Sequence, residues 1–565
     1  MKPNNSNVKH LLPFITDISD YTLPIAFTFP YYYTPHPLAD IAMTELQDYL
    51  ETQTEWSHDF TQRGMMFGVL VVKNDVGDIG YLSSFCDEVT ESNGNHFSPE
   101  FFVDAIANVD MSKIQRFERQ LMSLKLDIRK LKNSKNYIQL KQSLQEQRLE
   151  SERQIAEHQQ RNIEAKAERK QQRRDMEGHL GQSIDEASLQ SFIHELGAQS
   201  SREKRAFKAL KQQWQSQIAA LDEQLEQEQC KIVRMETEYA RLQRSFNIQQ
   251  QKSCQFLNRA GVKKSLYELF EQPNQSDAQQ PLSHSSEQNL PKLLQAAFLQ
   301  NLTPLALGEF WWGAAPYEQI RQHKNVYPVC QSKCFEVLQH MLEGLVIDPS
   351  PLEQTPSYDK SLEIVYEDDV LVVVNKPAEF LSVSGKYISD SVQARMQARY
   401  PHATGPLIVH RLDMSTSGLL VLTLSTEANK HVQKQFIERR VEKRYTALLE
   451  GKIQQDTGVI TLPLRGDLSD RPRQMVCHEQ GRVAETTYRV IDVIDNRTKI
   501  HLFPKTGRTH QLRVHCAHQA GLNTPIVGDD LYGFKDSRLH LHAGYLKFQH
   551  PSTGNTMEFE VTADF

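Results

Sequence analysis

Long hydrophobic runs are missing from this 565-residue chain. No stretch approaches the roughly 18 consecutive apolar residues that a membrane-spanning helix needs. The N-terminal residues Met1–Asn7 lack the apolar core of a secretory signal. The seven cysteines are odd in number and widely spread, which is typical of a reducing compartment and not of a disulfide framework. We therefore expect a soluble, cytoplasmic protein with no membrane partner.

An excess of basic charge is also missing, since the formal net charge is −7. That value on its own argues against RNA as a partner. The charge is uneven, however: residues 361–565 hold 25 Lys and Arg against 24 Asp and Glu, and residues 431–513 hold 16 against 10. A local basic face matters more to a phosphate backbone than the net charge does. The composition therefore permits an RNA partner without indicating one.

Proline is absent and glycine is rare in residues 111–258, which are rich in Gln, Glu, Lys and Arg. Apolar residues recur there with alternating spacings of three and four, which is typical of a coiled-coil seam. Three glycines and several serines separate two such runs, so we expect an antiparallel helical hairpin. Each arm would have about 60 residues and measure roughly 90 Å at 1.5 Å per residue. A solvated spacer or a dimerisation zipper would show the same pattern.

The regions that flank this insertion mix strand-like and helical runs. Met65 to Val72 and Ile79 to Phe85 are largely apolar, and Asn74 to Asp78 offers turn residues, which predicts a β-hairpin. We expect residues 1–110 and 259–350 to pack together as one small α+β domain, interrupted by the coiled coil at 111–258.

Two features of residues 259–350 suggest chemistry at first sight. Cys330 and Cys334 are four residues apart with His323 nearby, but no second paired set of metal ligands follows, so we expect ordinary buried thiols and no metal site. The aromatic run at 310–312 could stack on a nucleic-acid base, although such residues more often belong to a hydrophobic core. We expect a core.

A proline-containing linker at 351–360 precedes the last part of the chain. Residues 361–565 alternate short β-rich runs with helical ones, which predicts a mixed α+β domain around a sheet.

The most informative segment of that domain is His410-Arg411-Leu412-Asp413. It follows an apolar strand and precedes a Ser/Thr-rich turn that ends at Gly418. An acidic residue at such a switch from strand to loop is held rigidly and can face a cleft. The alternatives are an aspartate that caps a turn or one that pairs with Arg411.

Two further segments are rich in polar and cationic groups. The segment from Pro504 to His515 includes Arg508, Leu512 and Arg513 and could hold phosphate or a carboxylate, or simply form a solvated basic helix start. In the other, Tyr445 stands beside two cations and could stack on a base or serve as ordinary filler.

Together these segments resemble the RluA family of RNA pseudouridine synthases, with the motifs in the family's order over about the last 205 residues. Asn375-Lys376-Pro377 is similar to the family's first motif. The stretch from Leu464 to Gly481 is similar to the branch that modifies both large-subunit ribosomal RNA and a transfer RNA anticodon stem-loop. The chain departs from the family in its first 355 or so residues, which replace a short leader.

The resemblance implies a mixed, largely antiparallel sheet with flanking helices. It implies that Asp413 is the catalytic aspartate, that Tyr445 stacks on the target base and that Arg508 holds the Asp413 carboxylate. Leu512 would help to shape an apolar wall, and Arg411 would contact RNA beside a flipped nucleotide. The isomerisation involves neither redox change nor hydrolysis, so no cofactor is required.

Two other functions compete with this one. A catalytically idle RNA-binding or ribosome-assembly factor could keep the fold, and a structural coiled-coil protein could carry the last domain incidentally. The complete set of Asp413, Tyr445 and Arg508 favours an active synthase whose partner is structured RNA, either ribosomal or transfer RNA. We expect a monomer.

Overall fold

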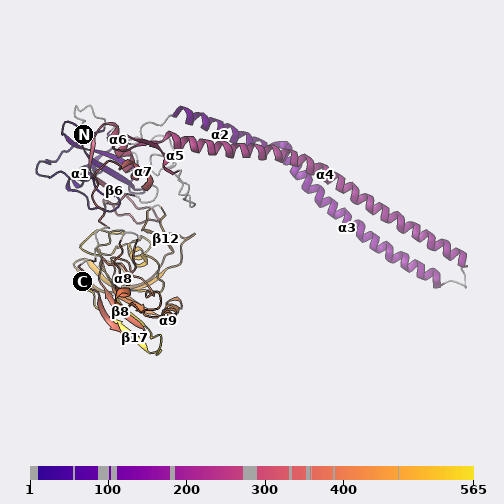
Figure 1. Ribbon diagram of the computed structural model, residues 1–565. Helices are drawn as coiled ribbons and strands as arrows, with labels where there is room; N and C mark the ends of the chain where they lie inside the picture. Colours follow the sequence, from indigo (N-terminus) through magenta and orange to yellow (C-terminus); the bar gives the residue numbers. More distant parts are fainter. Residues whose placement is uncertain are drawn as a thin grey trace. The chain divides into compact units, whose positions relative to one another are not determined.

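The structure is a computed structural model, shown in Figure 1. It describes residues 10–54, 58–86, 101–103, 111–178, 185–270, 289–329, 334–351, 357, 359–385, 388–468 and 470–565. The chain divides into two compact units, residues 1–109 with 252–565, and residues 110–251. Among the described residues, no helix is long and apolar enough to cross a membrane. Most of the linker predicted at 351–360, and Cys330, lie outside the described residues.

The first unit contains a small antiparallel sheet with the strand order β1-β3-β2-β6. Its strands are β1 (Leu12–Pro13), β2 (Met65–Lys73), β3 (Ile79–Cys86) and β6 (Thr303–Trp312). The hairpin of β2 and β3 confirms the prediction from the turn residues. Strand β6 pairs with β2 along its whole length, although more than 200 positions separate them in the chain. Residues on both sides of the helical insertion therefore form one sheet.

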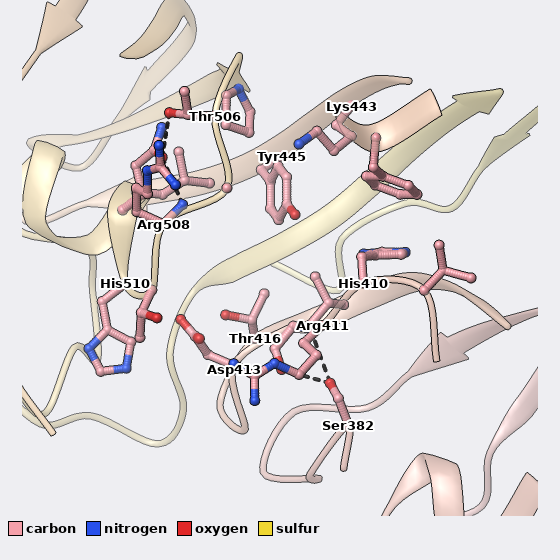
Figure 2. Close-up of a pocket in the computed structure, with 18 of the residues that line it drawn as sticks. Ser382, His410, Arg411, Asp413, Thr416, Lys443, Tyr445, Thr506, Arg508 and His510 are labelled. Carbon is pink, nitrogen blue, oxygen red and sulfur yellow. Dashed lines mark hydrogen bonds between the residues drawn. The ribbon is translucent and has the colours of Figure 1, made fainter. Parts of the chain in front are cut away.

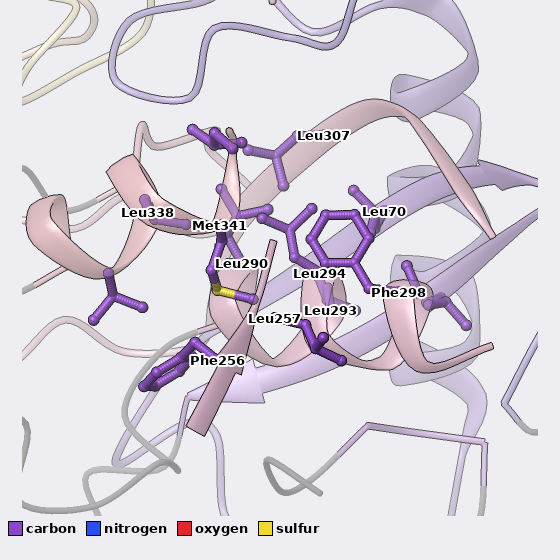
Figure 3. Close-up of a cluster of buried hydrophobic side chains, with 14 of the residues drawn as sticks. Leu70, Phe256, Leu257, Leu290, Leu293, Leu294, Phe298, Leu307, Leu338 and Met341 are labelled. Atoms are coloured by element: carbon purple, nitrogen blue, oxygen red, sulfur yellow. The ribbon is translucent and has the colours of Figure 1, made fainter. Parts of the chain in front are cut away.

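Both faces of this sheet are covered, so β2 is almost continuously apolar. Helix α1 (Pro37–Thr52) packs in the same core as Phe67, Val69 and Val71. Helices α6 (Asn289–Leu299) and α7 (Phe335–Met341) pack in a core with Leu70 on the other face (Figure 3). The short elements β4 (Gln255–Leu257), β5 (Lys263–Ser265) and α5 (Leu266–Phe270) precede them. Phe310 and Trp312 are buried in the first core, as predicted for the aromatic run.

The described residues of the second unit form three helices, α2 (Met111–Lys132), α3 (Lys135–Gly178) and α4 (Glu186–Ser253). Figure 1 shows α3 and α4 side by side over most of their length. Ion pairs join Lys132 to Glu236, Arg148 to Asp222 and Arg169 to Glu203, so the residue numbers rise on one side as they fall on the other. This order makes the helical hairpin antiparallel and intramolecular. Gly197 lies inside α4, so the chain reverses before it.

The rest of the first unit is built on a larger sheet with the strand order β11-β14-β15-β10-β16-β9-β8-β7, and with β17 also paired to β16. All of its described pairings are antiparallel except that of β16 with β9, which confirms a mixed, largely antiparallel sheet. The strands are β7 (Glu363–Glu367), β8 (Leu371–Lys376), β9 (Ser417–Thr423), β10 (Glu442–Leu449), β11 (Thr457–Thr461), β14 (Glu485–Ile494), β15 (Arg497–Pro504), β16 (Leu541–Gln549) and β17 (Thr556–Glu560).

Helices and a small hairpin complete this part of the chain. Helices α8 (Val392–Arg399) and α9 (Thr426–Ile437) begin at serines whose hydroxyls accept hydrogen bonds from backbone N–H groups of the first turn. Helix α10 (Gln511–Ala517) follows β15, and β12 (Leu464–Gly466) pairs with β13 (Gln474–Val476). At the start of β9, Gly418 has φ +117°, and a Cβ atom there would lie 2.4 Å from the Ala543 carbonyl oxygen. Only glycine allows β9 to approach β16 at this point.

Candidate active site

Asp413 lies in the loop that enters β9, and both of its chain neighbours are anchored. The hydroxyl of Ser382 donates to the Leu412 carbonyl (2.7 Å) and accepts from the Leu412 N–H (3.1 Å). On the other side, the Met414 carbonyl accepts hydrogen bonds from Nζ of Lys376 and from the Phe380 N–H, both at 3.0 Å. Leu412 itself is buried in the hydrophobic core beneath the loop. The backbone of Asp413 is therefore fixed from both ends.

The Asp413 carboxylate is uncommitted, which means that no described protein group binds it. Among the residues that the structure describes, its oxygens make no hydrogen bond or ion pair, and the turn contact of Asp413 is made by its backbone carbonyl to the Thr416 N–H. Within the described part of the chain, the Asp413 side chain neither caps a turn nor pairs with the exposed Arg411. The two structural alternatives to a catalytic role are therefore not observed.

The carboxylate borders a cavity of about 880 Å³ (Figure 2). The cavity brings together all five residues that the sequence singled out, from three separate segments of the chain. Arg411 and Asp413 come from the loop before β9, Tyr445 from β10, and Arg508 and Leu512 from the turn and helix after β15. The other groups that line it include His410, Phe436, Arg439, Lys443, Lys505, Thr506 and His510.

Tyr445 presents its ring to this cavity from β10, where the register against β16 shifts between Arg444 and Thr446. Burial, and then the nearby charge of Asp413, raise the pKa of the Tyr445 hydroxyl well above its ordinary value. The phenol is therefore neutral at physiological pH. A neutral aromatic ring beside a carboxylate is suited to stacking on a nucleic-acid base.

Lys443 and His410 both line the cavity, and both lie against the ring of Phe436. Burial lowers the pKa of the Lys443 ammonium group. Burial, and then the charge of Lys443, lower the pKa of His410 to about 3. The neutral His410 ring stacks on Phe436, and its Nε2 accepts a hydrogen bond from the Val421 N–H. His410 therefore forms a rigid part of the cavity wall and does not act as an acid.

The expected pair between Asp413 and Arg508 is not formed in this structure. Nε of Arg508 donates instead to the Val483 carbonyl at 3.2 Å, and its backbone N–H donates to the Gln511 side chain at 3.0 Å. Figure 2 shows Arg508 and Asp413 apart on the cavity wall. An ion pair that is accessible to water contributes little to stability, so the Arg508 guanidinium loses little by bonding to the Val483 carbonyl in place of Asp413. Arg508 remains adjacent to the cavity.

Arg513 differs sharply from Arg508, although both belong to the same basic segment. Its guanidinium donates to both Asp529 carboxylate oxygens and to Asp530, and Arg513 and Asp529 are almost completely buried. Burial opposes the Arg513 charge, but the two aspartates outweigh it and raise the pKa of Arg513 further. Arg513 thus fixes α10 in place. Leu512, one position earlier, is packed in the core at the cavity floor.

The residues that hold Asp413 were not predicted from the sequence. Lys376 was noted only as part of a motif, and Ser382 and His510 were given no role. Ser382 is 30 positions from Leu412, and no local pattern links them. The only available signal was the conjunction of Asn375, Lys376 and Pro377 after a strand. Within the described part of the chain, no group of His, Cys, Asp or Glu is arranged to hold a metal ion.

Comparison with known proteins gives a consistent result. Residues 370–518 match the family model described as RNA pseudouridylate synthase. The dual-specificity RNA pseudouridine synthase RluA of Salmonella typhi is 42% identical over 218 residues, which are 37% of this chain and 97% of that protein. The enzyme of the same name from Escherichia coli K12 is 43% identical with the same coverage. That from Vibrio vulnificus is 42% identical over 38% of this chain and 88% of its own length.

Among solved structures, human RNA pseudouridylate synthase domain containing 1 is similar at 32% identity. The similarity covers 39% of this chain and 87% of that one, with a TM-score of 0.31. The curated relatives are thus matched over most of their length by little more than a third of this chain.

Proposed function

Because this chain belongs to the RluA family of RNA pseudouridine synthases, we propose that it isomerises specific uridines in ribosomal RNA, transfer RNA or both, with Asp413 as the catalytic carboxylate. The observation that carries this proposal is the uncommitted Asp413 carboxylate, fixed by its neighbours at the edge of a cavity that also contains Tyr445. An idle RNA-binding protein has no need of such an arrangement.

The reaction breaks the C1′–N1 bond of uridine, turns the uracil and joins C1′ to C5. The hydrogen on C5 leaves as a proton, and N1 gains one, so neither an oxidant nor a water molecule is consumed. Asp413 either attacks the nucleotide covalently or removes the 2′ proton to give a glycal. In both routes the base must leave its stack, at a cost of a few kcal/mol. Stacking on Tyr445 offsets part of that cost.

The RNA backbone would be held by cations around the cavity. Arg411, Arg439, Lys443 and Arg508 line it, and among the described residues none of these side chains is in an ion pair. Cations that are not neutralised by a carboxylate are available for phosphate oxygens. Arg508 would leave Val483 and contact Asp413 or the flipped nucleotide once RNA excludes water. Leu512 would support the base from below.

The resemblance of residues 464–481 to the dual-specificity branch, and the names of the relatives, support ribosomal and transfer RNA as substrates.

We propose that residues 361–565 form the catalytic domain, that 1–110 with 259–350 form a second domain, and that 111–258 form a coiled-coil insertion. The intramolecular pairing of α3 with α4 supports a monomer, and the RNA substrates support a cytoplasmic location.

The test is tritium release from RNA labelled at C5 of uridine. The full chain is incubated with transcripts of ribosomal RNA domains and with transfer RNA anticodon stem-loops. We expect release from at least one of them, and mapped pseudouridine at a defined position. Asp413→Asn is nearly isosteric but is a poor nucleophile and base, so it should release no tritium while binding RNA within a few-fold of the unmodified chain.

The matched control is Asp495→Asn, an exposed aspartate at the tight turn between β14 and β15, where φ is +49° and asparagine is tolerated. This variant should be as active as the unmodified chain. Turnover by Asp413→Asn at the normal rate would disprove the assignment of Asp413. Absence of release from every transcript and from total cellular RNA would disprove the activity itself.

A further inference from the structure

Residues 317–327, which follow β6 of the small sheet, lie against the part of the chain that carries the cavity. Ile320 is buried in the same core as Leu512 and Val514 of α10. The Tyr317 carbonyl is 2.8 Å from Nε2 of His518, at the end of α10. These residues precede the region that matches the family model, which begins at residue 370. The cavity is therefore supported by a segment from outside the family's own domain.

The centre of this contact is a charge cluster. The Asp470 carboxylate accepts hydrogen bonds from Nη2 of Arg321 (2.7 Å) and Nη1 of Arg473 (2.9 Å). Both guanidinium groups also lie 4.9 Å from the centroid of the buried Tyr327 ring, so the same ring contacts both cations. The exposed fractions are 9% for Arg321 and 5% for Arg473. Burial favours a protonated Asp470, but Arg473 and then Arg321 outweigh it and lower the pKa of Asp470.

Hydrogen bonds connect this cluster to the cavity. Nε of Arg473 donates to the Leu531 carbonyl (2.8 Å), and the N–H of Gln474 donates to the Tyr532 hydroxyl (2.7 Å). The same hydroxyl is 2.9 Å from Nδ1 of His510. His510 lines the cavity in a left-handed conformation, with φ +51°, between Arg508 and Leu512. A strained residue at this place persists only where its surroundings hold it.

The 317–327 segment also holds Tyr532 directly. Nε2 of Gln322 donates to the Tyr532 carbonyl at 3.1 Å, and Nδ2 of Asn325 donates to the Gly533 carbonyl at 2.8 Å. Tyr532 is almost fully buried, so its hydroxyl has little freedom to seek other partners. Gln322 thus contacts the Tyr532 carbonyl directly, whereas Arg321 is linked to the Tyr532 hydroxyl only through Asp470, Arg473 and the next residue, Gln474.

We infer that Arg321 is a positioning residue for the reaction: through Asp470, Arg473, Gln474 and Tyr532 it holds His510, and with it the turn that carries Arg508, at the edge of the cavity. The role rests on the proposed function for its effect on turnover. It assigns a part in catalysis to a segment that precedes the region matched by the family model, which begins at residue 370.

The experiment compares Arg321→Met with Gln319→Leu in the full chain. Gln319 belongs to the same segment and donates to Asp467 at 3.1 Å, and Asp467 in turn accepts from the Asp470 N–H. Gln319→Leu therefore disturbs the same loop but leaves the Arg321–Asp470 ion pair in place. Arg321→Met should lower kcat for tritium release by about tenfold or more, since small misplacements of reacting groups are costly. The KM for RNA should be unchanged because Arg321 does not line the cavity. Gln319→Leu should keep kcat within about twofold of the unmodified chain, even if its Tm falls by as much as that of Arg321→Met.

Two further measurements separate positioning from simple loss of stability. Tyr532→Phe removes the hydroxyl that contacts His510, so its effect on kcat should be non-additive with that of Arg321→Met. Arg321→Lys keeps the charge without the planar fork and should recover only part of kcat. Additive effects in the first pair, or equal kcat losses for Arg321→Met and Gln319→Leu, would overturn the proposal.

Hydrogen exchange gives a readout that does not depend on activity. Peptides covering residues 508–514 should exchange faster in Arg321→Met than in Gln319→Leu, while peptides of β16 should exchange equally in both. Unchanged exchange at 508–514 would overturn the positioning role even where the enzyme is active. If the unmodified chain releases no tritium, the proposed function fails, whereas faster exchange at 508–514 would still show that Arg321 holds this turn.

Discussion

Nζ of Lys376 lies 3.0 Å from the carbonyl oxygen of Met414, the residue that follows Asp413. The same ammonium group donates to the carbonyls of Phe380 (2.7 Å) and Pro377 (3.0 Å). Lys376 is fully buried, and this burial lowers its pKa to about 7. A buried lysine thus joins two loops and fixes the backbone of Asp413.

Lys376→Met keeps the length of the side chain but removes its donors. Each buried carbonyl left without a partner costs about 1–3 kcal/mol, so the Tm should fall clearly. Tritium release should also fall by about tenfold or more, because the Met414 carbonyl beside Asp413 would then be held only by the Phe380 N–H. Lys360→Met is the control, since Lys360 donates to the Ala378 carbonyl and does not touch the Asp413 loop. Full turnover by Lys376→Met below its Tm would show that the anchor is not required.

Arg508→Met should affect activity and not stability. The half-exposed guanidinium makes one described hydrogen bond, to the Val483 carbonyl, so we expect the Tm to change little. If Arg508 contacts Asp413 or the flipped nucleotide during the reaction, kcat should fall by about 100-fold, as for other donors aimed at a reacting group. Arg508→Lys should recover little, because lysine lacks the planar fork.

The control for Arg508 is Arg482→Met, which removes an exposed arginine from the neighbouring strand connection. It should leave both Tm and kcat unchanged. Normal turnover by Arg508→Met would contradict the role that the family resemblance implies. A large drop in its Tm would show instead that the contact with Val483 is structural.

The sequence predicts the residues that carry out the chemistry better than it predicts the residues that hold them in place. Asp413, Tyr445 and Arg508 could be identified because each lies in a short motif that resembles one of the RluA family, and the structure places all three on the same cavity. The hydrogen bonds of Ser382 and Lys376 to the Asp413 loop depend on how strands distant in sequence pack, so no local pattern shows them. The same applies to Ile320, an isolated apolar residue that fills the core beneath Leu512.

Acid should destabilise the protein partly through His515. This residue is fully buried, with Nδ1 3.0 Å from the Thr486 hydroxyl. Burial lowers the pKa of His515 from 6.5 to about 4. The unfolded chain therefore binds a proton between these values while the folded chain does not. The contribution of His515 to stability is complete above about pH 6.5 and is lost as the pH falls towards 4.

Urea unfolding at a series of pH values measures this effect. His515→Asn, which can still bond Thr486, should be less stable at neutral pH but should lose less stability on acidification. His402→Asn, at an exposed histidine, should keep the slope of the unmodified chain. Equal slopes for His515→Asn and the unmodified chain would mean that other groups dominate the acid response.

The helical unit offers a prediction that separates its stability from catalysis. Leu225 of α4 is 8% exposed in the antiparallel hairpin, where long helices with few buried residues depend on their apolar seam. Leu225→Asp removes apolar contacts worth about 2–5 kcal/mol and places a charge in the seam. Amides of α3 and α4 should then exchange hydrogen much faster, whereas Gln227→Asp, on the exposed side, should change nothing.

Activity on a short stem-loop should stay within about twofold in Leu225→Asp, because residues of this unit do not line the cavity. A loss of turnover that parallels the loss of protection would show that the helical unit participates in the reaction. Unchanged exchange would show that the seam around Leu225 does not stabilise the hairpin. Normal turnover on the stem-loop with reduced turnover on a large ribosomal particle would assign the hairpin to the recognition of large substrates, since positioning on an extended surface matters only there.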